Sequence, residues 1–189
     1  MLWPKPRSTA DRCARLVLTL ALAGLVAGCF QPLYADRSMA DGSSVVHRLR
    51  SVEVGVIGNV AKGTPEARVA AELRNALMFE LAGGAPANSP THRLEMSMTP
   101  MRQQLIVDVT TSRPDVEQAG INMIYTLVEL STGRTVVSGQ TFSRVSYDNP
   151  GQEQRFSRER GRRDAESRAS KVIAEDIRSR LASYFIAGT

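Results

Sequence analysis

Apolar and polar residues alternate along three stretches of the chain, which is the pattern of a strand with one buried face, and a fourth strand of mixed pattern is predicted to return from a hairpin turn. In the first stretch Val52, Val54 and Val56 form the apolar side. The four predicted strands cover residues 50–56, 92–109, 121–127 and 135–147. The apolar sides of the second and third strands consist of Leu94, Met96, Met98, Leu105, Val107 and Val109, and of Ile121, Met123, Tyr125 and Leu127.

Two residues interrupt the alternation, and one short segment predicts a turn. Pro100 lies inside the second strand, where its missing N–H predicts a broken ladder or a bulge. Gly139 lies inside the fourth strand, where we expect a bend or a bulge. The segment Ser131–Arg134 has the composition of a hairpin turn, with Gly133 at the position expected to need positive φ.

Apolar residues at spacings of three and four predict two amphipathic helices. In the first, Thr64 can cap the helix, Pro65 suits its first position, and Glu66 favours the positive end of the helix dipole. This helix ends at Gly83-Gly84. The second helix follows Asp148–Gly151 and runs to the end of the chain. The two apolar stripes are Val69, Leu73, Ala76, Leu77 and Leu81, and Ala165, Ala169, Val172, Ile173, Ile177, Leu181, Tyr184 and Phe185.

The order of these elements is strand, helix, three strands, helix. The last strands pair through a hairpin, and both helices are free to cover one face of the sheet. We therefore predict an α+β fold, a β-α-β-β-β-α two-layer sandwich with two helices packed on a four-stranded sheet.

The first 28 residues have the three parts of a secretory signal. Lys5 and three arginines precede the apolar run Leu16–Gly24, and the small residues Ala27 and Gly28 precede Cys29. The run is too short to cross a bilayer core of about 30 Å. Small-small-Cys resembles the lipobox of bacterial lipoproteins, which implies cleavage before Cys29 and covalent lipid on this residue. An ordinary signal followed by an incidental cysteine is the alternative.

This interpretation divides the chain into three parts. Residues 1–28 are a lipoprotein-type signal peptide, residues 29–44 are the lipidated N-terminus and a polar tether, and residues 45–189 are a single α+β domain. The chain has two cysteines, Cys13 and Cys29, so a domain that begins at residue 45 forms no disulfide. Four basic residues fall in the signal, so an argument for an anionic partner must depend on clustering and not on the net charge of +5.

The sequence offers little catalytic chemistry. It has no G-x-S-x-G, no H-E-x-x-H, no P-loop and no Gly-rich dinucleotide turn. Of its two histidines, His47 follows the tether, and His92 lies on the apolar side of a strand, where a satisfied, partly buried side chain is the expected role. We predict no enzyme, no metal site and no cofactor other than lipid on Cys29.

Arginine clusters at the start of the second predicted helix: Arg155, Arg158, Arg160, Arg162 and Arg163 fall within nine residues. One interpretation is a solvated helix face that Glu153, Glu159 and Asp164 balance. The other is a phosphate-binding surface, because guanidinium groups bind phosphate oxygens in bidentate fashion. An exported, lipid-anchored protein makes a phosphorylated lipid or an acidic protein wall a better partner than nucleic acid.

Two segments carry a family resemblance. The lipobox followed by Phe30–Tyr34 (FQPLY) resembles the start of the LPS-assembly lipoprotein LptE family. The segment Phe142–Pro150 (FSRVSYDNP) is similar to the last strand and Asp-Asn-Pro helix start of that family. The predicted order of strands and helices also agrees.

The resemblance implies a non-enzymatic lipoprotein at the periplasmic face of the outer membrane. Family members plug the LptD-type β-barrel, support its assembly and help to insert lipopolysaccharide into the outer leaflet. The implied partners are therefore LptD, lipopolysaccharide and, through the anchor, the membrane. Basic residues that contact lipopolysaccharide in the family correspond here to Arg113, which we expect in the loop between the second and third strands, and to Arg155 and Arg158.

Three other functions stay open at this point. The first is an auxiliary lipoprotein of an ABC-type lipid transport system, which is also small, lipid-anchored and mixed α/β. The others are a structural lipoprotein that grips peptidoglycan and a lipid-anchored hydrolase. Co-purification of an LptD-type barrel separates the LptE function from the auxiliary one, and an activity-based probe that labels a serine would favour the hydrolase.

Overall fold

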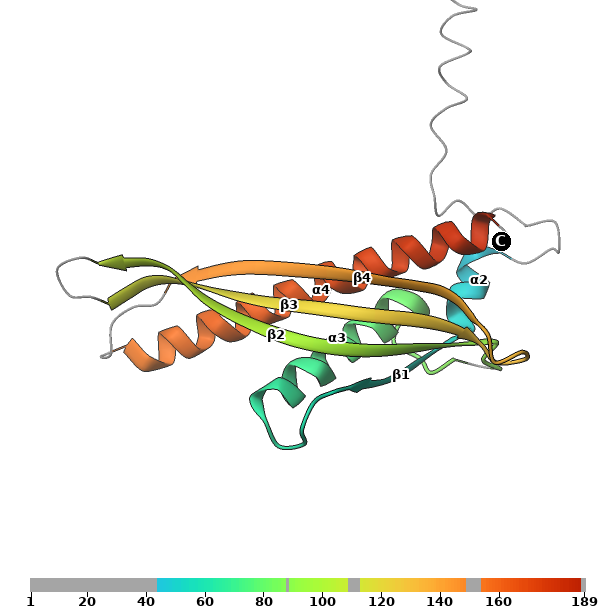
Figure 1. Ribbon diagram of the computed structural model, residues 1–189, viewed down its shortest axis with the longest axis horizontal. Helices are drawn as coiled ribbons and strands as arrows, with labels where there is room; N and C mark the ends of the chain where they lie inside the picture. The colour runs from blue at the N-terminus through green and yellow to red at the C-terminus, as the bar shows by residue number, and fades with distance from the viewer. Residues whose placement is uncertain (1–43, 88, 109–112, 149–153, 188–189) are drawn as a thin grey trace, which may run out of the picture. The chain divides into compact units, whose positions relative to one another are not determined.

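The computed structural model describes residues 44–87, 89–108, 113–148 and 154–187, without the side chains of residues 104–115. Its four strands are β1 (Val52–Gly58), β2 (His92–Asp108), β3 (Arg113–Glu129) and β4 (Thr135–Asp148). They form one sheet in the order β1-β2-β3-β4. β1 runs parallel to β2, and the other neighbours are antiparallel (Figure 1). Cys29 lies outside the described residues.

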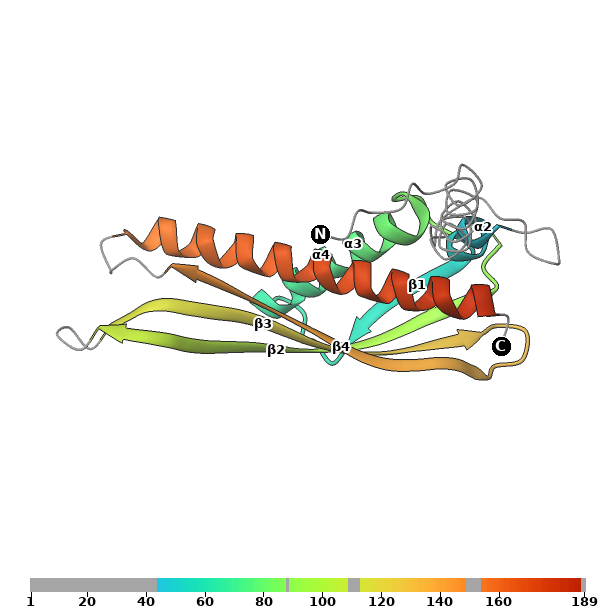
Figure 2. The ribbon, with the colours of Figure 1, turned by 90° about the horizontal axis from the view of Figure 1, so that it is seen from above.

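The described helices are α2 (Val45–Arg50), α3 (Pro65–Ala82) and α4 (Arg155–Ala187). Both α3 and α4 lie on the same face of the sheet, which leaves its other face without a helix (Figure 2). The α+β prediction of two helices on a four-stranded sheet is confirmed. The sequence analysis missed α2 because six residues are too few to show a helical period, although Ser44 caps it and Val45 and Leu49 are buried.

The core lies between the helices and the covered face of the sheet. Large side chains from both layers are fully buried there: Leu73, Leu77, Leu94, Met98, Ile121, Met123, Leu127, Ile173, Ile177 and Leu181. The predicted ends of α3 are also confirmed, because the hydroxyl of Thr64 accepts a bond from the N–H of Ala67 and Gly83 has φ 71°. Gly133, at φ 68°, takes the predicted left-handed position in the β3–β4 turn.

Val56 is 83 % exposed, so its predicted place on the buried face of β1 is wrong. The register with β2 shifts between Val54 and Ile57, and this irregularity turns Ile57 inward in place of Val56. Gly55 lies at the shift, where a Cβ atom would approach the carbonyl oxygen of Leu94 to 2.8 Å. The sequence therefore uses a glycine to let the two backbones meet closely.

The irregularity predicted at Pro100 and the bulge predicted at Gly139 are also wrong. Pro100 pairs regularly with Ile121 in the β2–β3 ladder. It is tolerated because β1 ends at Gly58, opposite Ser97, so β2 has an open edge beyond that point. Gly139 pairs regularly with Tyr125, and its missing side chain makes room for the tyrosine ring.

The stripe of α4 is confirmed from Ala165 to Phe185, except at Val172, which is 50 % exposed. Val172 directly precedes the buried Ile173, so it lies about 100° around the helix from the core. Before Ala165 the helix presents mainly arginine.

Candidate functional site

The arginine-rich half of α4 contains two kinds of arginine. Arg162 faces inward, and its side chain is 14 % exposed. Its Nη2 atom donates to Glu159 Oε1 at 2.5 Å, and its Nη1 atom donates to Glu166 Oε1 at 2.7 Å. Arg163 Nε also donates to Glu159, at 3.0 Å. These two arginines are therefore neutralised by carboxylates of their own helix.

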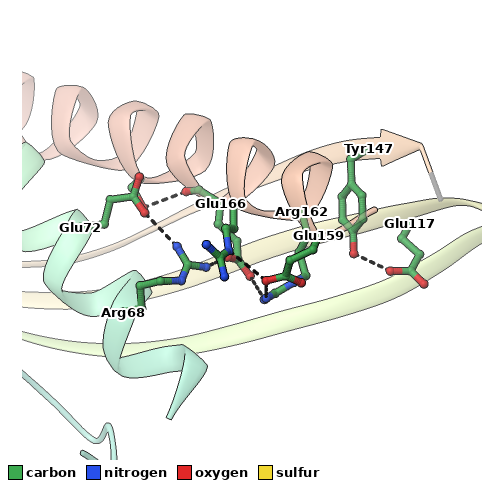
Figure 3. Close-up of polar contacts among 9 residues, drawn as sticks. Arg68, Glu72, Glu117, Tyr147, Glu159, Arg162 and Glu166 are labelled. Carbon is green, nitrogen blue, oxygen red and sulfur yellow. Dashed lines mark hydrogen bonds and ion pairs between the residues drawn. The ribbon is translucent and has the colours of Figure 1, made fainter. Parts of the chain in front are cut away.

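Glu166 connects this group to the neighbouring helix. Its carboxylate also accepts a hydrogen bond from Arg68 of α3, which in turn pairs with Glu72 (Figure 3). The side chain of Glu166 is only 11 % exposed, so the bonds to Arg162 and Arg68 form largely away from water. Removing one partner from such a group would leave a charge desolvated and uncompensated. The network therefore joins α3 to α4 and fixes the position of the arginine-rich turns.

The electrostatics of Glu159 follow from its neighbours. Hydrogen bonds from Arg162, followed by those from Arg163, lower the pKa of Glu159 to about 2. Glu159 is therefore ionised at neutral pH. Its carboxylate accepts hydrogen bonds from both Arg162 and Arg163 and balances part of their positive charge.

A second contact holds the same part of α4 to the sheet. Tyr147 of β4 donates its hydroxyl to Glu117 Oε2 of β3 at 2.5 Å (Figure 3). Burial of Tyr147, together with this bond to Glu117, raises the pKa of the tyrosine to about 12. Gly161 passes over Tyr147, where a Cβ atom would lie 3.6 Å from the ring. A small apolar cluster of Ala119, Tyr147 and Ala165 thus docks α4 at this point.

Arg155 and Arg158 are exposed, as a ligand-binding function requires. Neither has a hydrogen bond or ion pair with another described residue, and the same is true of Arg160. Arg113 does not lie in the loop, as predicted, but is the first residue of β3, where its backbone pairs with Asp108. Its side chain is outside the described part. The starts of β3 and α4 lie at the same end of the sheet (Figures 1 and 2).

A cavity of about 170 Å³ lies beside this region, between the start of α3, α4 and strands β2 and β3. Its charged lining consists of Arg102, Arg162, Glu66 and Glu166. Two positive and two negative groups do not favour an anion. The exposed arginines are therefore the better candidate for phosphate binding.

His92 behaves as the sequence predicted. It is half-buried, its Nδ1 atom lies 2.8 Å from the hydroxyl of Thr91, and its ring meets Phe185 edge-on at 5.3 Å. Burial lowers its pKa. Within the described ranges no three His, Cys, Asp or Glu residues gather into a group that could hold a metal ion. No helix there has the length and apolarity of a membrane span.

The structure adds an apolar surface that the sequence analysis missed. On the uncovered side of the sheet Ile124 is 61 % exposed and Phe142 is 64 % exposed. Arg144 lies over the Phe142 ring at 5.2 Å, and Asn122 donates to Met101 Sδ at 3.0 Å. We call these five residues the open face. The sequence signal for the open face is that Ile124 and Phe142 are apolar although they lie on the side of their strands that faces away from the core.

Comparison with known proteins decides the family. The model of the LptE family, described as lipopolysaccharide-assembly, matches residues 49–181, which is most of the chain. The chain belongs to the LptE family. The match extends from α2 into the last turns of α4, so it includes Arg113, Arg155 and Arg158 of this LptE-family protein.

Solved structures share the fold of this LptE-family chain. A protein from Caulobacter crescentus CB15, described as a lipoprotein, is 20% identical, with a TM-score of 0.60, and the match covers 77% of this chain and 97% of that one. The rare lipoprotein B from Shewanella oneidensis is 11% identical, with a TM-score of 0.51. That match covers 72% of this chain and 96% of the Shewanella chain. At these identities the likeness concerns the fold. No curated protein sequence matches the chain.

Proposed function

We propose that this LptE-family protein is a lipid-anchored lipoprotein of the outer membrane that plugs an LptD-type β-barrel, supports its assembly and helps to insert lipopolysaccharide into the outer leaflet. The observation that carries the proposal is the family match over residues 49–181. The anchor would be lipid on Cys29, at the periplasmic face. Two or more acyl chains would make this attachment stable.

The exposed arginines supply the contact with lipopolysaccharide in this proposal. Arg155 and Arg158 have no carboxylate partner among the described residues, and Arg113 begins β3 at the same end of the sheet. Guanidinium groups form charge-assisted, bidentate bonds with phosphate oxygens. The same helix holds Arg162 and Arg163 in ion pairs, so the proposal assigns the contact to Arg113, Arg155 and Arg158 and not to these two.

The open face supplies the contact with the barrel. The lumen of a transmembrane β-barrel is polar. The strands on this side present mainly uncharged polar residues around the apolar group, among them Thr99, Thr126, Ser138 and Gln140. Arg144 is the one charged residue of the open face, so few ions are desolvated there when two sheets meet. A plug that turns this face to the barrel wall keeps its arginine end free for lipopolysaccharide.

The test of the lipopolysaccharide contact is a charge reversal. We expect the variant Arg113→Glu/Arg155→Glu/Arg158→Glu of the full-length lipoprotein to bind lipopolysaccharide at least tenfold more weakly, because each charge-assisted hydrogen bond is worth about 1.5–3 kcal/mol. A matched pair of double variants provides the control. Arg155→Glu/Arg158→Glu reverses two exposed charges at the start of α4, and Arg50→Glu/Arg134→Glu reverses two exposed charges at the other end of the sheet. Unchanged binding, or equal losses in both double variants, would refute this contact.

A further inference from the structure

One edge of β2 is unpaired beyond the end of β1. The last residue of β1, Gly58, lies opposite Ser97, whereas β2 continues to Asp108. Among the described residues no other strand pairs with β2 on this side, and β2 forms the border of the sheet there (Figure 1). Such an edge presents backbone N–H and C=O groups with which another extended chain can pair.

The ladder with β3 shows which backbone groups of β2 face this edge. In an antiparallel sheet two opposite residues exchange either two hydrogen bonds or none. Pro100 has no N–H, so its regular pair with Ile121 is of the second kind and its C=O faces the open edge. The direction alternates along a strand, so the N–H and C=O of Arg102 face the same way. The C=O of Leu94 agrees, because it lies beside Gly55 of β1.

Pro100 limits the strands that can pair at this edge. A partner cannot place a C=O against the missing N–H, and natural proteins use proline on edge strands to prevent indiscriminate pairing. The N–H of Arg102 is the next donor along the edge. The edge therefore accepts an extended segment only in a restricted register.

The cavity between α3, α4 and the sheet adjoins the same edge. Its lining includes Pro100 and Arg102 of β2 and Pro65, Glu66 and Val69 of α3. Its volume of about 170 Å³ is on the order of ten times the roughly 15 Å³ that one water needs. A strand paired with β2 places every second side chain on the covered side of the sheet, where this cavity lies. One side chain of such a strand can therefore enter the cavity.

Two of the four charged groups in the cavity are available to an incoming side chain. Arg162 and Glu166 are already bound to each other. Glu66 and Arg102 form no ion pair within the described part of the chain. Hydrogen bonds from its own N–H and from Thr64, followed by the charges of Arg102 and Arg162, lower the pKa of Glu66. The available groups are therefore one carboxylate and one guanidinium.

A carboxamide matches this pair of charges. Its C=O accepts from a guanidinium and its NH2 group donates to a carboxylate, so a single Asn or Gln side chain uses both. A charged side chain would be attracted by one group and repelled by the other, and an apolar side chain would desolvate both. We infer that the open edge of β2 binds an extended segment of a different polypeptide by strand addition, with an Asn or Gln side chain of that segment between Glu66 and Arg102. This inference does not depend on the proposed function.

The backbone pairing is tested with a phage-displayed library of random short peptides on the purified full-length protein. Fluorescence anisotropy then measures the affinity of the selected peptides. We expect Arg102→Pro to bind them at least about tenfold more weakly than Arg102→Gln, because both substitutions remove the guanidinium and only proline removes the edge N–H. The ladder with β3 should tolerate this proline as it tolerates Pro100. Equal binding by the two variants, or a library without a binder, overturns the inference.

A second measurement leaves the protein unchanged. Methyl groups are placed on alternate backbone nitrogens of a selected peptide, in the two possible patterns. We expect the pattern on the side that faces β2 to abolish binding and the other pattern to preserve it, because a strand bonds to its neighbour through every second residue. Equal effects of the two patterns overturn strand addition, even if Arg102→Pro fails to fold.

The selected peptides also test the cavity. We expect them to share an Asn or Gln at one position, and its replacement by Asp to weaken binding at least about fivefold. Glu66→Gln should reduce or reverse this preference, because Arg102 then has no opposing carboxylate in the cavity. The control Glu53→Gln, on the part of the sheet where β1 covers β2, should leave it unchanged. Peptides without a shared Asn or Gln, or a preference that Glu66→Gln does not alter, overturn the inference.

Two other occupants of the edge would be detected with the same variants. A wild-type dimer that Arg102→Pro dissociates in sedimentation equilibrium would identify a second copy of the chain. A gain in peptide affinity when residues 30–43 are deleted would identify the N-terminal segment of the chain itself. Either result overturns binding of a different polypeptide. Recovery of a barrel from outer membranes is scored separately, so a failure here differs from a failure of the proposed function.

Discussion

Gly139 and Tyr125 face each other in the β3–β4 ladder, and the glycine determines whether the tyrosine fits. A Cβ atom at residue 139 would lie 2.6 Å from the tyrosine hydroxyl oxygen, well inside contact distance. At Gly58 the nearest atom would be 3.5 Å away, which is ordinary contact. The two glycines thus differ in packing and not in turn geometry, since neither has a positive φ.

We therefore expect Gly139→Ala to lower the free energy of unfolding by about 1–3 kcal/mol, the range for overpacked sites. Gly58→Ala should change it by less than about 1 kcal/mol, in either direction. Urea denaturation of the purified protein measures both. Equal effects of the two substitutions would show that Tyr125 moves without strain.

Glu166 is the residue on which the contact between α3 and α4 depends. Its side chain is 11 % exposed and bonds to Arg162 and Arg68, whereas the ion pair of Asp164 with Arg168 is more than half exposed on both sides. We expect Glu166→Gln to cost about 1–3 kcal/mol of stability, between the values for exposed and buried pairs. Asp164→Asn, which removes a charge from the same helix, should cost less than about 1 kcal/mol.

Urea denaturation compares these two variants as well. If Asp164→Asn destabilised the protein as much as Glu166→Gln, the contact between α3 and α4 would not depend on the ion pairs of Glu166 with Arg162 and Arg68. If neither variant had an effect, the arginine-rich turns would be held by the apolar cluster of Ala119, Tyr147 and Ala165 alone.

At the scale of elements, the first half of α4 should respond to acid. The pKa of Glu159 is about 2 in the folded chain, below the value of about 4.3 expected for an unfolded one. The Glu159 carboxylate therefore binds a proton less readily in the folded chain than in the unfolded one. Its contribution to stability is fully present above the pKa of the unfolded chain and is lost as the pH falls from about 4 to 2. Because the side chain is 43 % exposed, salt should reduce the effect.

We expect the urea midpoint of the wild type to fall as the pH is lowered from about 4 to 2, and the fall to be smaller in Glu159→Gln. The substitution removes the titrating group, so at pH 7 the variant should be the less stable of the two. An identical pH dependence in the two proteins would show that Glu159 contributes nothing to the acid response.

The elements also show how far the sequence could predict the fold. Periodicity predicted β1, β2, β3, α3 and α4, because each buries a stripe that repeats at its own spacing, and the hairpin turn at Ser131–Arg134 predicted β4. It misplaced Val56 and Pro100, because these depend on where β1 shifts register and where it ends, and both are properties of the pairing between strands. The short α2 has its cap and two buried residues but no period long enough to detect.

The candidate site was predictable only in part. The arginine cluster is visible in the sequence, but which of its members pair with carboxylates is set by the helical spacing of Glu159 and Glu166 and by Arg68 from α3. The open face required the strand register, which aligns Asn122 with Phe142 and Ile124 with Gln140.

At the scale of the whole molecule, the family match and the division of surfaces support one arrangement. The helices cover one face of the sheet, the open face is uncovered, and Arg155, Arg158 and Arg160 lie exposed at one end. In the proposed arrangement the open face meets the barrel wall and the arginine end meets lipopolysaccharide, while lipid on Cys29 holds the protein to the membrane.

The most direct test is a pull-down of the tagged, full-length lipoprotein from outer membranes in a gentle detergent, with mass spectrometry of the bound proteins. The account predicts one large LptD-type β-barrel in near-equal amount, and a reduced yield of it from the open-face variant Ile124→Asp/Phe142→Asp but not from the control Phe79→Asp, at an exposed residue of α3. Recovery of ABC-transport components without a barrel, or of no partner from the wild type, would contradict it.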